Sequence, residues 1–194
     1  ASDNTGIAPG SNIIMMKVCN AAGSCSGSAM LSGLDWCISN RTVYNISVIS
    51  ISIGADLYSS YCDSTSSFTS SINNATAVNI SVVIAAGNGN NNDGVGRSTQ
   101  IAEPACVENA TAVSAVDKSD SIASYADRGN LTDLFAIGSS VVSTSKSGST
   151  ETRSGTSMAT PHLAGILLIT NGTPVVSGYV TGDPDNTSDP IGHL

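Results

Sequence analysis

Apolar positions along the 194-residue chain follow two alternating patterns, one typical of strands and one typical of helices. Continuous or β-branched apolar runs predict strands. They span residues 13–18, 43–53, 80–86, 111–116 and 134–137. Helical spacing of apolar residues predicts helices over 26–39 and 158–169, and a weaker amphipathic pattern predicts one over 64–78. A hairpin is expected over 141–153, and the tail after residue 171 is expected to be mostly loop.

Strands that alternate with helices predict a mostly parallel sheet that helices cover on both faces. Residues 80–86 form a near-continuous apolar run, as expected of a strand that is buried on both sides. Residues 158–169 are apolar almost all round, which predicts a fully buried helix that is too short to span a membrane. Because the chain shows no repeat and no linker, we expect residues 1–194 to form a single α/β domain with three layers.

The charge balance excludes two classes of partner. Charged residues make up only 11% of the chain, and 15 acidic residues against 7 basic ones give a net charge of −8. A nucleic-acid-binding protein would carry a basic stripe, and a protein that docks on an anionic membrane would carry basic clusters. We therefore expect neither nucleic acid nor a membrane as a partner.

The five cysteines favour, weakly, an oxidising compartment. Cys19 and Cys25 could close a small loop, and Cys37 could pair with Cys62. Cys106 would then be the unpaired cysteine. A zinc site would need close pairs such as Cys-x-x-Cys, and none occurs. The chain also has eight Asn-x-Ser/Thr sequons, a number that follows in large part from its richness in Asn, Ser and Thr. They begin at Asn40, Asn45, Asn74, Asn79, Asn109, Asn130, Asn171 and Asn186.

The segment 155–162, GTSMATPH, places a serine where a buried helix is expected to begin. Unpaired N–H groups and the positive end of the helix dipole stabilise negative charge there. A nucleophilic serine needs such a place, because its carbonyl adduct carries an oxyanion. Pro161 is tolerated if it lies within the first turn of the helix. On local sequence alone, however, the simpler interpretation is that Ser157 and its neighbours are ordinary helix caps.

A second polar position follows the apolar run of residues 80–86. Asn88 lies at the carboxyl end of this predicted strand, where open parallel sheets bind their ligands. Its amide N–H₂ group can donate to an oxyanion. The simpler interpretation is an Asn-Gly turn. A dinucleotide loop is a third reading, but the Gly87-x-Gly89 pattern continues with Asn92 instead of glycine, and no helix is indicated there.

Five segments, taken in order, resemble the C-terminal part of the catalytic domain of subtilisin-like serine proteases (subtilases). They are GIAPGSNIIMMKV at 6–18, SVISISIGA at 47–55, AAGNGN at 85–90, SAVDKSDSIASYADRGNLTDLFAIG at 114–138 and GTSMATPHLAG at 155–165. The resemblance covers roughly residues 6 to 170 and implies a subtilisin-like three-layer α/β fold. One local departure is Ile137, which stands where the family usually has a proline.

The resemblance implies roles for individual residues. Ser157 is the nucleophile that it implies, and Asn88 is the side-chain donor of the oxyanion hole, with the Ser157 N–H as its partner. Ser52, Ile53 and Gly54 would pair with the substrate backbone as an added strand. Ala85, Ala86 and Gly87 would form the opposite wall of the primary specificity pocket, with Ala102 near its floor. The Glu103–Pro104 bond matches a position that is cis in the family.

The general base of a catalytic triad is missing from the 194 residues. Family members carry an aspartate motif and a histidine motif upstream of the segment matched at 6–18, and this chain begins too late to contain either. His162 matches a helix histidine that is not the base, so we expect it to have a core role, and His193 is expected to be solvated in the tail. We therefore expect an incomplete domain that lacks its N-terminal portion and is inactive alone. The missing portion is then a candidate partner chain.

The leading hypothesis is a secreted serine endopeptidase that acts on peptides or proteins without a catalytic cofactor. Small, apolar pocket walls predict a preference for a large uncharged or aromatic P1 side chain, although Glu103 lies near the floor. Structural calcium is possible, with Asp183, Asp185 and Asp189 in an acidic tail, but a solvated turn explains these residues better. Asp117, Asp120 and Asp127 are expected in a solvated loop.

The alternative to a serine endopeptidase is a pseudoprotease or interaction module. A nucleotide-binding oxidoreductase is a third hypothesis.

Overall fold

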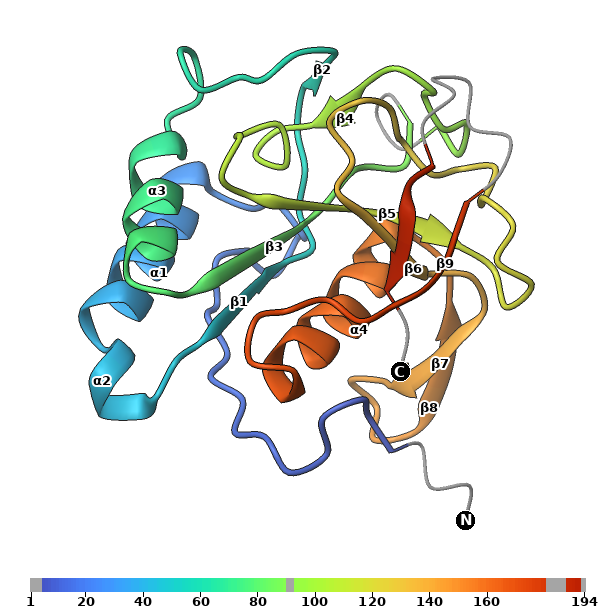
Figure 1. Ribbon diagram of the computed structural model, residues 1–194. Helices are drawn as coiled ribbons and strands as arrows, with labels where there is room; N and C mark the ends of the chain where they lie inside the picture. The colour runs from blue at the N-terminus through green and yellow to red at the C-terminus, as the bar shows by residue number, and fades with distance from the viewer. Residues whose placement is uncertain (1–4, 90–92, 181–187, 193–194) are drawn as a thin grey trace.

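A six-stranded sheet forms the centre of the molecule (Figure 1). The computed structural model describes residues 5–89, 93–180 and 188–192. The strands lie in the order β1-β3-β5-β6-β10-β9, and all neighbours are parallel except β10 and β9. Their bounds are Val48–Ile51 for β1, Ser81–Ala85 for β3, Thr111–Val116 for β5, Leu134–Ile137 for β6, Val176–Tyr179 for β9 and Pro190–Gly192 for β10.

Helices cover both faces of this sheet, which confirms the predicted three-layer α/β architecture. Helices α1 (Gly27–Ser39) and α3 (Thr69–Ala77) contribute to the apolar core on one face. Helix α4 (Thr156–Ile169) packs on the other face against β1, β3, β5 and β6. All residues of β3 and β5 after the first are buried, as the apolar run in the sequence predicts.

Shorter elements surround the main sheet. Strands β7 (Val141–Thr144) and β8 (Thr150–Arg153) form the predicted hairpin. The sequence did not indicate the two-residue strands β2 (Leu57–Tyr58) and β4 (Ile101–Ala102), which pair with each other. The Glu103–Pro104 peptide bond is cis, as the resemblance implied.

Two predicted strands near the start of the chain need correction. Residues 13–18 pair with no other strand in the described part of the chain, and Ile13 and Met15 are 81% and 84% exposed. The run predicted over 43–53 is a strand only at Val48–Ile51. Its first residues belong to the short helix α2 (Arg41–Tyr44), which ends because Asn45 adopts a left-handed conformation at φ 53°.

Three predictions about the later elements also need correction. Helix α3 covers only the second half of the range 64–78. The tail contains strands β9 and β10, because Ile191 packs against the buried Phe135 and extends the sheet. Helix α4 is not buried all round: it begins two residues earlier than predicted, and Ile169 is 51% exposed.

Two disulfides cross-link the chain. The predicted Cys19–Cys25 bridge closes a small loop. The second bridge joins Cys62 to Cys106, so the pairing of Cys37 with Cys62 was wrong, and Cys37 is a free, buried thiol in α1. No helix in the described ranges is long and apolar enough to cross a membrane.

Candidate active site

The beginning of α4, with Ser157, and the segment around Asn88 meet at the carboxyl ends of the parallel strands. Ser157 is the second residue of α4 and is partly exposed. Asn88 follows β3 by three residues. The backbone N–H of Thr156 donates to Asn88 Oδ1 at 2.9 Å, and the hydroxyl of Thr156 donates to the same oxygen at 3.2 Å. These bonds join the end of a buried strand to the start of a buried helix.

The two bonds from Thr156 also orient the amide of Asn88. Because Oδ1 accepts both of them, the Nδ2 group points away from Thr156 and makes no hydrogen bond to any other described residue. The hydroxyl of Thr156 in turn accepts a bond from the Gly87 N–H at 3.2 Å. Thr156 is fully buried and was missed by the sequence reasoning, although its place beside the serine in GTS was the available signal.

Ser157 and Ser52 are linked by reciprocal hydrogen bonds. The Ser157 hydroxyl donates to Ser52 O at 3.3 Å, and the Ser52 hydroxyl donates to Ser157 O at 2.9 Å. In a regular helix the N–H of residue 161 would bond to Ser157 O, but Pro161 has no N–H. The expectation that this proline lies in the first turn was wrong, because it is the sixth residue of α4. Ser52 satisfies the carbonyl that the proline leaves free.

A buried carboxylate anchors the loop that carries Asn88. Asp127 is completely buried, so its assignment to a solvated loop was wrong. Its two carboxylate oxygens accept hydrogen bonds from Gly89 N at 2.9 Å and from Arg97 N at 2.7 Å. Gly87, at φ 116°, packs so closely that an added Cβ would overlap Asp127 Oδ2. The only signal in the sequence was that Asp127 directly follows the apolar positions 123, 125 and 126.

Burial raises the pKa of Asp127, while the two backbone donors pull it in the opposite direction. The surroundings of Asp127 therefore disfavour the charged carboxylate more than water does around an exposed aspartate. Its geometry serves the loop, since the bond to Gly89 N fixes the backbone directly after Asn88.

The residues expected to bind substrate lie on two segments that approach each other at Ala102. An added Cβ on Gly54 would lie 2.8 Å from the Cβ of Ala102, and one on Gly87 would lie 3.2 Å from it. Ser52, Ile53 and Gly54 follow the end of β1 and belong to no strand of the described structure.

Ala85, Ala86 and Ala102 are buried as whole residues, and the N–H and C=O of Ala86 are bonded to Val113 O and Ala102 N. Ala102 N donates to Ala86 O at 2.6 Å, which ties the two segments together.

The described histidine is not placed to activate Ser157. The ring of His162 bonds through Nδ1 to the Met158 carbonyl oxygen at 3.1 Å, one turn earlier in α4. The side chain is partly buried, in line with the expected core role. His193 lies outside the described residues, as do Asp183 and Asp185 of the calcium prediction. Asp189 is described and is buried beside β10. No group of three possible metal ligands occurs within the described ranges.

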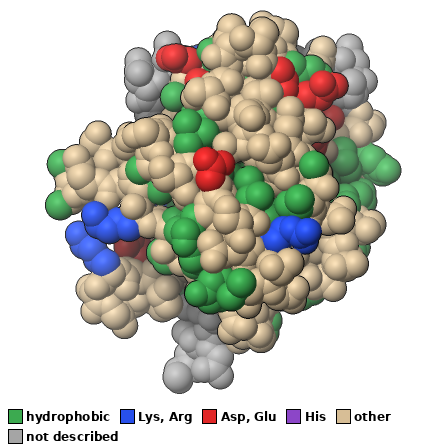
Figure 2. Space-filling model, turned by 90° about the vertical axis from the view of Figure 1, so that its left-hand side faces the viewer, with side chains coloured by type: hydrophobic (Ala, Val, Ile, Leu, Met, Phe, Trp, Pro, Cys, Tyr) green, Lys and Arg blue, Asp and Glu red, His purple; other side chains and the backbone are tan. Residues whose placement is uncertain are grey.

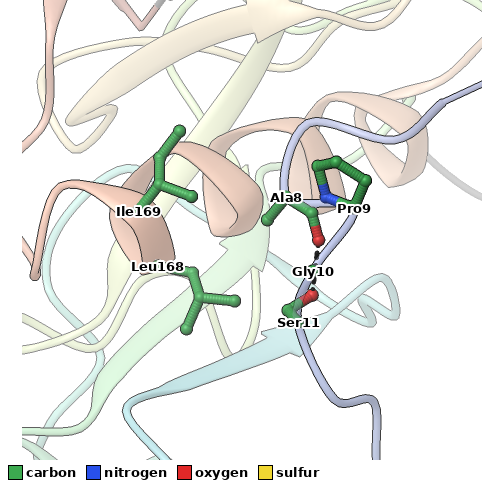
Figure 3. A pocket seen from close by; sticks show the side chains of 6 residues that line it. All are labelled: Ala8, Pro9, Gly10, Ser11, Leu168 and Ile169. Atoms are coloured by element: carbon green, nitrogen blue, oxygen red, sulfur yellow. Dashed lines mark hydrogen bonds between the residues drawn. The ribbon is translucent and has the colours of Figure 1, made fainter.

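A separate hollow lies at the opposite end of α4 (Figure 3). Leu168 and Ile169 face the turn at residues 8–11, where the Ser11 hydroxyl donates to the Ala8 carbonyl oxygen at 2.7 Å. The site lies at the first turn of α4 and this hollow at its last, roughly 16 Å away by the rise of a helix. The hollow is therefore not part of the candidate site.

We predict that replacing Asp127 with asparagine changes how stability depends on pH. A folded-state pKa above the ordinary aspartate value means that the folded protein binds more protons in the interval between the two. The free energy of unfolding of the parent, minus that of Asp127→Asn, should therefore fall as pH rises through this interval. Urea unfolding of both proteins across a pH series measures the difference, in which all other titrating groups are shared. A difference that rises with pH would show that the two N–H donors outweigh burial.

Asp127→Ala serves as the matched variant, because it removes both acceptors and leaves the N–H groups of Gly89 and Arg97 without partners. Each unsatisfied group costs about 1–3 kcal/mol, so we expect this variant to be less stable than Asp127→Asn.

Comparisons with known proteins agree with this geometry. A sequence model of the subtilase family matches residues 1–175. The "Cuticle-degrading serine protease" of Arthrobotrys oligospora is 34% identical over 168 residues, which cover 86% of this chain and 38% of that protein. "Subtilisin-like protease 3" of Trichophyton equinum is 32% identical over 169 residues, or 86% and 39% of the two chains. The chain thus spans less than half the length of these curated relatives.

A solved structure of a cold-adapted subtilisin-like serine proteinase superposes with a TM-score of 0.71 at 29% identity. The alignment covers 90% of this chain and 64% of that one. Fold, sequence match and order of the segments lead to one conclusion: the chain belongs to the subtilase family.

Proposed function

We propose that Ser157 is the nucleophile of a serine endopeptidase and that Asn88 stabilises the oxyanion. The hydrogen bond from Thr156 N to Asn88 Oδ1 carries this proposal, because it presents Nδ2 beside the start of α4. The second donor is the N–H of Ser157, which lies in the first turn of the helix and needs no partner within the helix. Membership of the subtilase family supports the same activity.

In the proposed reaction, Ser157 Oγ attacks the carbonyl carbon of the scissile peptide bond. The C=O π electrons move to oxygen, which accepts hydrogen bonds from Asn88 Nδ2 and Ser157 N. Collapse of this tetrahedral adduct expels the amine with a proton, and water then hydrolyses the ester on Ser157. These steps require no cofactor.

The proton of Ser157 must leave before or during attack. Its only hydrogen-bond acceptor among the described residues is the Ser52 carbonyl, which is not a base. His162 is bonded to its own helix. We therefore propose that the general base comes from a part of the parent protein outside these 194 residues, either tethered to them or supplied as a separate chain, and that the isolated chain is inactive.

Peptides and proteins are the proposed substrates. Ser52, Ile53 and Gly54 leave strand β1 with no strand beside them in the described structure. Apart from Ser52 O, which accepts the Ser157 hydroxyl, their backbone groups would pair with an extended substrate chain. A secreted location fits the two disulfides, which persist in oxidising compartments.

A pseudoprotease that keeps the fold for binding is the second candidate. The absence of a base beside Ser157 among the described residues favours it. The two candidates differ in one property, the reactivity of the Ser157 hydroxyl toward an electrophile in the full-length protein.

We predict that a fluorophosphonate probe labels the folded full-length gene product at Ser157. Intact-mass and peptide analysis should find the adduct on the parent and none on Ser157→Ala.

Asn88→Ala should slow peptide hydrolysis about 100- to 1,000-fold, mainly through kcat, because it removes one oxyanion donor. Asn12→Ala, at an exposed asparagine far along the chain from the site, is the matched control and should react like the parent.

Absence of labelling in a folded full-length protein would reject the protease and favour the pseudoprotease. The 194-residue chain alone should not react, and rapid labelling of it would show that the proposed external base is unnecessary.

We further predict a preference for large uncharged or aromatic P1 side chains. The segments that meet at Ala102 contribute only small groups near the proposed pocket, Gly54 and Gly87. Fluorogenic peptides that differ only at P1 should give higher kcat/KM for Phe, Tyr or Leu than for Lys or Arg. A kinetic preference for basic residues would contradict the assignment of the pocket, and Glu103→Gln would then test whether this carboxylate attracts them.

A further inference from the structure

Four sequons lead directly into four neighbouring parallel strands. Their asparagines are Asn45 before β1, Asn79 before β3, Asn109 before β5 and Asn130 before β6. Because these strands are parallel, all four residues, the amino-end asparagines, lie at the same edge of the sheet. Ser157 and Asn88 lie at the opposite edge.

Each amino-end asparagine faces outward, and the residue after it faces inward. All four asparagines are exposed. Ile80 and Ala110, which follow two of them, are 1% and 7% exposed. Ile46 and Leu131, which follow the other two, pack against the main core. At three of the four sites the strand entry therefore leaves the side-chain amide in solvent and buries its neighbour. At the fourth, Asn109 Nδ2 donates to Asn73 Oδ1 at 3.0 Å, and this exposed bond must open before Nδ2 can carry a sugar.

The hydroxyl groups of these four sequons have no structural role that explains them. They belong to Ser47, Ser81, Thr111 and Thr132. None makes a side-chain hydrogen bond to another described residue, whereas Thr76, in the sequon on α3, bonds to two carbonyls of its own helix.

The asparagines themselves are only partly explained by the fold. Left-handed conformations, at φ 53° and 60°, account for Asn45 and Asn79 after helices α2 and α3. No such conformation occurs at Asn109 or Asn130, although the bond from Asn109 Nδ2 to Asn73 Oδ1 gives Asn109 one structural contact. Eight of the chain's 16 asparagines begin a sequon, although Ser and Thr together make up 50 of 194 residues. Chance placement would give about a quarter of the asparagines a hydroxyl residue two positions later, so half is an excess.

We propose that the amino-end asparagines carry N-linked oligosaccharides. The transfer takes the sugar from a lipid-linked pyrophosphate donor. The bond between sugar C1 and the donor's phosphate oxygen breaks, a bond from C1 to the asparagine Nδ2 forms, and the amide loses one proton as the lipid pyrophosphate leaves. The proposal rests on the secreted location proposed above and not on protease activity.

This arrangement keeps glycans away from the candidate active site. Nine residues separate Asn79 from Asn88, which corresponds to roughly 25–30 Å along an extended strand. The turns into β1 and β3 lie on the left of Figure 1, and the ends of these strands lie to the upper right. Figure 2 shows the left-hand side covered mainly by uncharged polar side chains and backbone, where glycans would add hydration that few charges supply.

Site mapping of the full-length gene product, secreted from a eukaryotic host, tests the proposal. Peptide N-glycosidase in heavy-oxygen water converts each glycosylated asparagine to an aspartate that carries heavy oxygen, which peptide mass spectrometry locates. We expect this label at at least three of the four amino-end asparagines. Label at two or fewer, or retention of unglycosylated protein inside the host, would overturn the proposal.

Matched hydroxyl variants separate a lost sequon from a misfolded protein. Ser47→Ala and Ser81→Ala should each remove one glycan, while Ser47→Thr and Ser81→Thr should keep it. After enzymatic deglycosylation, the alanine variants should melt with the parent, because neither hydroxyl is hydrogen-bonded. The Ser157→Ala form serves equally well in all these measurements, so failure of the proposed catalysis would leave the glycan map unaffected.

Discussion

Two hydrogen bonds to one amide oxygen hold the candidate site together. Asn88 Oδ1 accepts both of them from Thr156, so the end of strand β3 is joined to the beginning of helix α4. Without this link, the proposed oxyanion donor and nucleophile would sit on segments that are 69 positions apart in the sequence. These segments would then share core packing and the bond from Gly87 N to the Thr156 hydroxyl. The rest of the fold holds the end of β3 and the beginning of α4 in place. Every residue of β3 after the first is buried, and α4 packs across four strands.

The supports around this link use polar groups in unusual places. Pro161 interrupts the backbone hydrogen bonds of α4 because it has no N–H. The Ser52 hydroxyl donates to the Ser157 carbonyl oxygen that this interruption leaves free. Asp127 accepts two backbone N–H groups from the Asn88 loop although its burial disfavours the charge. Such arrangements lower the stability of the fold locally. They are typical of sites in which side chains must be held in one orientation.

The sequence predicts those parts of the fold in which one strong local pattern coincides with burial. Strands β3 and β5 could be located almost to the residue, because apolar runs of this kind fit only a sheet covered on both faces. Predictions of element type fail where a backbone conformation or a distant contact, neither of which the apolar pattern shows, determines the element. A left-handed Asn45 turns the expected start of β1 into a short helix, and packing of Ile191 on Phe135 makes strands of the tail.

The candidate site shows the same division. Ser157 and Asn88 can be selected from the sequence because five segments in order resemble subtilases, whereas their local patterns alone fit a helix cap and an Asn-Gly turn. The burial of Asp127 cannot, since its neighbours resemble those of any acidic loop and its two partners lie 30 or more positions away. Pairing of Cys62 with Cys106, across 44 residues, likewise depends on the folded arrangement and not on spacing.

A crystal structure of the full-length protein after reaction with a peptidyl phosphonate would show whether Asn88 and Ser157 together bind the oxyanion. We expect a covalent bond from Ser157 Oγ to phosphorus. We also expect one phosphoryl oxygen about 3 Å from both Asn88 Nδ2 and the Ser157 backbone nitrogen. Asn88 Oδ1 should still accept the Thr156 N–H. A phosphoryl oxygen that lies away from Asn88, or an Asn88 amide released from Thr156, would contradict this arrangement.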